Sequence, residues 1–104
     1  MSTTPTEAAA RHDVEEIPGL DELADALLTC RTRDELKPFL RDLCTLGELG
    51  ALVHRWQIVR LLDQGLPYLE IAERVHASTA TVTRVAQWLR HGAGGYTLAL
   101  ERTR

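Results

Sequence analysis

The feature that most constrains the fold follows Pro67, where two short stretches with helical spacing of apolar residues flank a turn at residues 76–78. A tight turn between two short helices, with a small residue where they cross, is the pattern of a helix-turn-helix. Ala72 supplies the small residue, and Ser78 is a good N-cap for the second helix. His76 stands where such a turn often carries glycine, which weakens the turn without excluding it. The residues expected to form the shared core of this motif are Ile71, Val75, Val82, Val85 and Leu89.

The second helix of this motif begins with short polar side chains that suit a close approach to DNA. Threonine hydroxyls and methyls can meet base edges in the major groove, and backbone amides at a helix start can hold a phosphate. Helical spacing places Thr79, Ala80 and Thr83 on the groove-facing side, with Thr81 at its margin. An ordinary helical hairpin with solvated arginines would fit the same spacing, but the run S-T-A-T-V-T-R after E-I-A favours DNA binding. The residues predicted to bind DNA are Ser78, Thr79, Ala80, Thr81, Thr83 and Arg84, with Arg60, Arg74 and Arg90 at flanking phosphates.

Three further helices are predicted upstream of the motif. The first apolar stripe begins at Leu20 and ends near Cys30. Thr32 and Thr45 each precede a glutamate by three residues, which is the capping-box pattern that opens a helix. Gly65 is expected to end the third helix in a left-handed C-cap. The coarse prediction is therefore an all-α fold of five helices and no strands. The inward positions expected in the third helix are Leu49, Leu52, Val53, Trp56, Val59 and Leu62.

The chain is expected to hold one compact domain preceded by an arm. Residues 1–18 are polar and acidic and predict a disordered N-terminal arm, whose negative charge opposes a role in contacting DNA. Residues 19–104 predict the helix-turn-helix domain with a short C-terminal tail. In that tail, Tyr96, Leu98 and Leu100 are expected to dock on a partner chain as an extended segment or a short helix.

The distribution of charge matters more than its total. The formal net charge of −3 argues at first sight against a nucleic-acid binder. However, residues 1–50 hold 5 basic and 11 acidic groups, a net −6, whereas residues 51–104 hold 7 basic and 4 acidic groups, a net +3. A positive face can therefore lie on the half of the chain that carries the motif.

Other classes of protein are disfavoured by what the sequence lacks. No apolar run approaches the roughly 18 residues of a membrane helix, and the start lacks the apolar core of a secretion signal, so we expect a cytoplasmic protein. Cys30 and Cys44 are expected to be small buried side chains rather than a disulfide, and the four scattered histidines lack metal-ligand spacing. Without a nucleophile and base, paired carboxylates or a glycine-rich phosphate loop, the sequence predicts neither a cofactor nor an enzyme.

A family resemblance is carried by five runs between Leu20 and Leu98: D-L-C-T-L-G-E-L, H-R-W-Q-I-V-R-L-L, E-I-A-E, S-T-A-T-V-T-R-V and G-G-Y-T-L. They are similar to segments of the Trp-repressor-like family, especially its YerC/YecD branch. The resemblance implies an intertwined homodimer whose two recognition helices enter successive major grooves of double-stranded DNA. It thus implies a transcriptional regulator, a repressor, that binds a palindromic operator.

The same resemblance points to a candidate effector pocket. Thr45, Arg55 and Arg84 match the family's tryptophan-binding threonine and the two arginines that flank the indole. Val85 stands where the repressor has glycine, and Trp88 replaces a small polar residue, so both side chains would occupy the ligand's volume. Packing therefore favours arginines paired with backbone or carboxylate groups, and tryptophan is not expected to be the co-repressor.

Two alternatives to a tryptophan-independent repressor stay open. The acidic net charge would suit a helical protein-interaction or assembly module that keeps the fold without the DNA contacts. Arg55 and Arg84 would suit a repressor gated by an amino-acid-like small molecule. DNA binding must weaken steeply with salt, which distinguishes a repressor from an assembly module.

Overall fold

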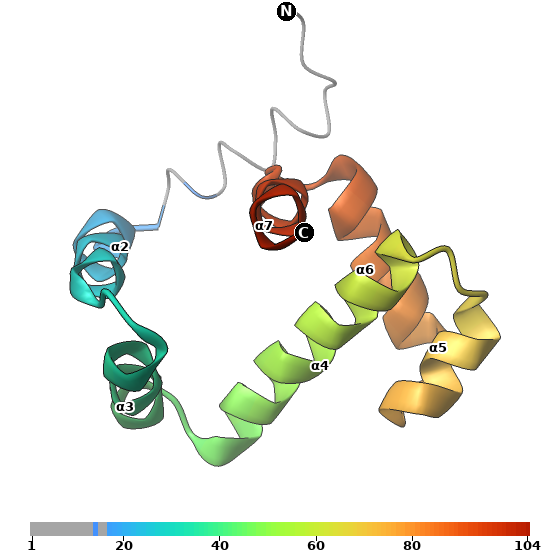
Figure 1. Cartoon of the computed structure of the whole chain (residues 1–104), viewed down its shortest axis with the longest axis horizontal. Helices are drawn as coiled ribbons and strands as arrows, with labels where there is room; N and C mark the ends of the chain where they lie inside the picture. The colour runs from blue at the N-terminus through green and yellow to red at the C-terminus, as the bar shows by residue number, and fades with distance from the viewer. Residues whose placement is uncertain (1–13, 15–16) are drawn as a thin grey trace, which may run out of the picture.

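The computed structural model describes Val14 and residues 17–104. The all-α prediction is confirmed, because this part of the chain contains helices and no strand (Figure 1). The predicted number of five helices is wrong, because good helix formers after Gly95 make a sixth helix of the tail. The predicted N-terminal arm, residues 1–18, lies almost wholly outside the described residues. The helices are α2 (Leu20–Thr29), α3 (Arg33–Leu43), α4 (Leu46–Asp63), α5 (Tyr68–Val75), α6 (Thr79–His91) and α7 (Gly95–Thr103).

Threonine N-caps open α3 and α4, as predicted. The Thr45 hydroxyl accepts a hydrogen bond of 3.1 Å from the Glu48 backbone N–H, and the Glu48 carboxylate accepts one of 2.8 Å from the Thr45 N–H. The bond that the carboxylate accepts from the Thr45 N–H is the main cause that lowers the pKa of the Glu48 carboxyl below its usual value. At α3 the Thr32 hydroxyl accepts from the Glu35 N–H, but the Glu35 carboxylate accepts from the Arg31 N–H instead. The reciprocal capping box is therefore complete only at α4.

The end of α4 is closed by Gly65, as predicted. Gly65 has a φ of +80°, in the left-handed region that favours glycine. Its N–H donates to the Leu62 carbonyl at 3.0 Å, and the Leu66 N–H donates to the Leu61 carbonyl at 3.3 Å. These two bonds turn the chain away from α4 and so fix where the helix-turn-helix begins.

The hydrophobic core lies where α4, α5 and α6 meet. From α4 it takes Ile58 and Val59, which are fully buried. Ala72, the predicted crossing residue, is 6% exposed, so the two helices of the motif approach closely there. The predicted core residues Ile71, Val75, Val82 and Val85 are buried, and Leu89 is partly buried against them.

The C-terminal helix α7 packs on the core of its own chain. Leu100 is 6% exposed and belongs to the core, and Tyr96 packs against it one turn earlier. An ion pair with Asp63 on α4 also holds Arg104 at the end of α7, and the carboxylate raises the pKa of that guanidinium. The short helix predicted for the tail is confirmed. Leu100 is buried in its own chain and so is not available to a partner, whereas docking of the half-buried Tyr96 on a partner stays a prediction. Leu98 lies on another face and is 45% exposed.

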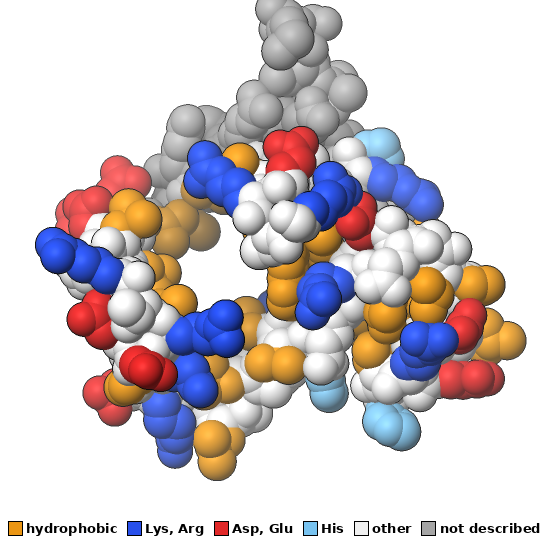
Figure 2. Space-filling view, viewed as in Figure 1, with side chains coloured by type: hydrophobic (Ala, Val, Ile, Leu, Met, Phe, Trp, Pro, Cys, Tyr) orange, Lys and Arg blue, Asp and Glu red, His pale blue; other side chains and the backbone are white. Residues whose placement is uncertain are grey.

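Helices α2 and α3 stand apart from this core in the single chain. Neither contains a buried residue, although both carry the predicted apolar stripes. Two of the predicted inward positions on α4, Leu52 and Val53, are 45% and 51% exposed. Figure 1 shows an open space between the α2–α3 side and the other helices, and hydrophobic side chains border it in the space-filling view (Figure 2). Much of the apolar surface of the first three helices is therefore uncovered.

Candidate nucleic-acid interface

The turn between α5 and α6 is held by backbone geometry at His76. Its φ of 56° makes it the one non-glycine residue with positive φ in the described part of the chain. The Ala77 N–H donates to the Ala72 carbonyl at 3.0 Å and closes the end of α5. His76 thus takes the left-handed conformation at which glycine is common, and the predicted turn forms without a glycine.

The start of α6 is organised by Ser78 and Thr81. The Ser78 hydroxyl accepts a hydrogen bond of 3.1 Å from the Thr81 backbone N–H, and the two hydroxyls lie 3.0 Å apart. The predicted N-cap is therefore confirmed. Thr81 is half-buried, so these two side chains fix the direction in which the helix leaves the turn.

The outer face of α6 contains the residues predicted to read bases. Thr79, Ala80 and Thr83 are exposed, whereas Val82 and Val85 between them are buried. The Thr83 hydroxyl donates to the Thr79 carbonyl at 2.9 Å. The structure thus brings small side chains together on one accessible face at the beginning of the helix.

Gln87 belongs to the same face but was not singled out from the sequence. It lies one turn after Thr83, and it is exposed. A glutamine side chain can donate to and accept from adenine in the major groove. The four-residue spacing from Thr83 was the signal that could have revealed it.

The four predicted DNA-binding arginines are exposed but differ in their partners. Arg74 pairs with Glu70 one turn earlier, at 2.8 Å. Arg90 donates to a tyrosine hydroxyl at 2.8 Å. Arg60 lies near Arg74, where both line a pocket of about 300 Å³ between α4 and α5. Arg84 has no hydrogen-bond or ion-pair partner among the described residues.

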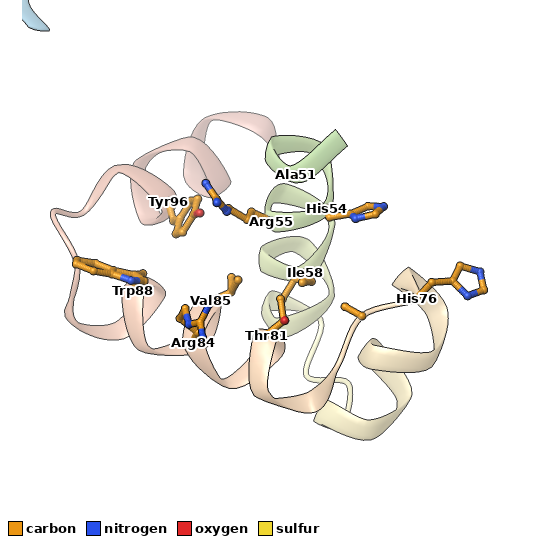
Figure 3. Close-up of a pocket in the computed structure, with 11 residues that line it drawn as sticks. Ala51, His54, Arg55, Ile58, His76, Thr81, Arg84, Val85, Trp88 and Tyr96 are labelled. Carbon is orange, nitrogen blue, oxygen red and sulfur yellow. The ribbon is translucent and has the colours of Figure 1, made fainter. Parts of the chain in front are cut away.

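A larger pocket of about 600 Å³ lies between α4 and α6. Arg55 comes from α4 and Arg84 from α6, and both side chains are exposed. Figure 3 shows Arg55 and Tyr96 on one side of the pocket, with Arg84 and Trp88 on the other. The lining residues are Ala51, His54, Arg55, Ile58, His76, Ala77, Thr81, Arg84, Val85, Trp88 and Tyr96.

This geometry corrects two expectations about the pocket. Neither Arg55 nor Arg84 makes a hydrogen bond or ion pair with a backbone or carboxylate group of the described residues. Val85 and Trp88 line the pocket instead of filling it, since Val85 packs into the core and Trp88 is 54% exposed. Thr45 is absent from the lining, and its hydroxyl caps α4.

Residues 18–104 match the family model described as Trp repressor protein. The chain belongs to the Trp repressor family. Proteins of the Trp repressor family are DNA-binding regulators of transcription and not enzymes. The chain is therefore a helical DNA-binding regulator, in agreement with the interpretation of its helix-turn-helix.

Relatives within the Trp repressor family are similar over most of the chain. The uncharacterized protein YerC of Bacillus subtilis (strain 168) is 36% identical over 85 residues, which cover 82% of both proteins. The crystal structure of a TrpR-like protein from Eubacterium eligens has a TM-score of 0.80 and 34% identity, covering 88% of this chain and 94% of that one. The crystal structure of a protein from Staphylococcus aureus that is described as a putative Trp repressor has a TM-score of 0.79 and 40% identity. The match covers 88% of this chain and 91% of that one.

Other kinds of site have little support in the described part of this Trp repressor family member. Among its described residues, no three histidine, cysteine or acidic side chains gather as they would around a metal ion. Cys30 and Cys44 are half-buried free thiols. None of the described helices has the length and apolar character needed to cross a membrane.

Proposed function

We propose that the protein is a transcriptional repressor that binds a palindromic operator as a homodimer, with α6 of each copy in the major groove. The observation that carries this proposal is the division of α6 into a buried and an exposed face. Val82 and Val85 hold the helix on the core, which leaves Thr79, Ala80 and Thr83 together on the outside. A helix fits the major groove, and small side chains at its start allow a close approach to base edges.

The homodimer is supported by the apolar surface that one chain leaves uncovered. Leu52, in the first half of α4, lies within roughly 20° of the buried Val59 around the helix axis, yet it is 45% exposed. Only the second half is buried in the chain's own core. A second copy that presents the same surfaces could cover the first half of α4 together with α2 and α3, as in a two-fold symmetric interface.

The proposed function is tested by selecting bound sequences from a random pool of duplex DNA. We expect enrichment of a two-fold symmetric motif with half-sites about 10 base pairs apart, one turn of the duplex. Mobility shifts at several salt concentrations should then show affinity falling steeply as salt rises. If no duplex is enriched, or if binding is insensitive to salt, the assembly-module alternative replaces the repressor.

DNA binding is further proposed to be independent of tryptophan. The start of α6 is already fixed by the Ser78 cap and by the burial of Val82 and Val85, so the recognition helix needs no ligand to order it. Mobility shifts with and without added tryptophan should therefore give the same affinity.

A second candidate function is a repressor gated by an amino-acid-like small molecule. It is favoured by the two guanidinium groups, Arg55 and Arg84, that face the 600 Å³ pocket without partners among the described residues. Such groups suit a carboxylate, and Ile58 and Tyr96 suit an apolar body beside it. Calorimetric titration with each of the common amino acids tests this candidate. Saturable heat that disappears in Arg55→Ala would support it, and the absence of heat for all of them would reject it for amino acids.

A further inference from the structure

We propose that Tyr68 and Arg90 form a phosphate clamp, in which the Tyr68 hydroxyl positions the Arg90 guanidinium for the DNA backbone. This inference rests on the proposed DNA binding by α6, and it adds Tyr68 as a positioning residue. Its basis is the hydrogen bond of 2.8 Å that Arg90 Nη2 donates to the Tyr68 hydroxyl oxygen. The ligand is a phosphodiester group of double-stranded DNA.

The hydrogen bond joins the far ends of the helix-turn-helix. Tyr68 is the first residue of α5, and Arg90 lies in the last turn of α6. The other ends of these helices are already joined by the turn at residues 76–78. The Tyr68 ring packs against the hydrophobic core, so its hydroxyl is held on a fixed support. The position of Arg90 is thus tied to the geometry of the whole motif.

Arg90 lies on the face of α6 that is proposed to read DNA. It follows Thr83 by seven residues, which places it within roughly 20° of Thr83 around the axis and about 10 Å further along it. The major groove is about 12 Å wide, so when the first turn of a helix enters the groove, its last turn lies near the edge of the groove. Backbone phosphates form that edge, and they are the groups that an arginine would meet there.

The kind of partner distinguishes Arg90 from Arg74. Arg74 pairs with the carboxylate of Glu70 at 2.8 Å, which opposes its positive charge. The partner of Arg90 is a neutral hydroxyl, which directs the guanidinium without reducing its charge. The guanidinium has five N–H donors, and the described residues take only one of them. Arg90 is therefore both oriented and free to bind a phosphate through two parallel hydrogen bonds.

The clamp is tested by a double-mutant cycle on the operator selected with the wild-type protein. Arg90→Ala should weaken binding to all sequences alike and lower the slope of log affinity against log salt by about one. Tyr68→Phe removes only the hydroxyl and should weaken binding by about three- to tenfold. In the Arg90→Ala background, Tyr68→Phe should change affinity by less than about twofold, because its effect passes through Arg90.

Two further arginines provide controls for this cycle. Arg102→Ala removes the same charge from α7, outside the helix-turn-helix, and should leave affinity nearly unchanged. Arg74→Ala should lower the salt slope by less than Arg90→Ala, because Glu70 already opposes that charge. If both arginines of the motif change the slope equally, the neutral hydroxyl has no special role and the clamp is wrong.

Other outcomes would also overturn the clamp. If Tyr68→Phe strengthens DNA binding, the hydroxyl sequesters Arg90 from DNA. If its effect is equally large with and without Arg90, Tyr68 acts only through fold stability, which thermal unfolding of both variants measures. Arg90→Lys offers a check that retains the charge, and it should keep the salt slope while losing affinity. A wild-type protein that selects no duplex would instead refute the proposed function itself.

Discussion

The hydroxyl of Thr83 donates a hydrogen bond of 2.9 Å to the backbone carbonyl of Thr79, one turn earlier on α6. This bond uses the only proton of the Thr83 hydroxyl, so toward DNA the side chain offers lone pairs and a methyl group. It can accept from the amino group of adenine or cytosine, or its methyl can contact the methyl of thymine. The internal hydrogen bond therefore restricts which bases this position can prefer.

Threonine substitutions on this face should change specificity and not salt dependence. Thr79→Ala and Thr83→Ala are each expected to alter the preferred sequence by about 1–3 kcal/mol for each base that the side chain no longer reads. Alanine favours helix, so the fold should persist. Repeated selection from random duplexes measures the change, with Thr97→Ala on α7 as an exposed control. An unchanged motif and affinity for both variants would show that α6 does not read bases there.

Dimerisation should depend on the first half of α4. Sedimentation at micromolar concentration is expected to show a dimer, because a second copy would bury the exposed apolar surface of α2, α3 and α4. Leu52→Glu and Val53→Glu should shift the protein toward the monomer, because each would place an unpaired carboxylate in the proposed dimer interface. Leu69→Glu, at a position 65% exposed on α5, is the matched control and should remain dimeric. A wild-type monomer that still binds a palindromic site would contradict the homodimer.

The packing of Val85 should matter for stability more than for any ligand. Val85→Gly is expected to cost about 2–4 kcal/mol of unfolding free energy, from the cavity and from glycine in a helix. Ala86→Gly, at the next buried position, should cost only about 1 kcal/mol. Urea unfolding gives both values. Calorimetry of the wild type with millimolar tryptophan should show no saturable heat, and a saturable heat would reverse the proposal of tryptophan independence.

The cap of α4 should make stability sensitive to acid. Thr45→Ala removes the hydroxyl that caps the helix and is expected to cost about 1 kcal/mol in urea unfolding. The pKa of Glu48 is lowered in the folded protein, so its contribution is present above the usual value near 4.5 and is lost as pH falls through the folded pKa. Glu48→Gln should remove this part of the acid dependence. If Thr45→Ala instead abolishes ligand binding while leaving stability unchanged, Thr45 is an effector contact and not a cap.

The local elements of this fold could be predicted from the sequence because their causes lie within a few residues. The Thr45 and Glu48 capping box depends on neighbours three positions apart, and the Gly65 C-cap on one residue's conformational freedom. The crossing at Ala72 follows from its size between two apolar stripes. The same reasoning placed Thr79 and Thr83 on one exposed face, since helical spacing alone decides that.

The site around these elements depended on how the helices lie against one another. The tyrosine at position 68 meets Arg90 across 22 positions, and no short-range pattern connects them. Val85 was expected to fill a ligand pocket, yet the packing of α6 on α4 directs it into the core and leaves Trp88 at the pocket's edge. The sequence by itself therefore determined α2 to α6, the residues that cap them and the exposed face of α6, all of which are set by local backbone geometry and spacing. Only the tertiary structure decided the pocket, the partners of the arginines and the docking of α7, because these depend on distances between helices that spacing along the chain does not set.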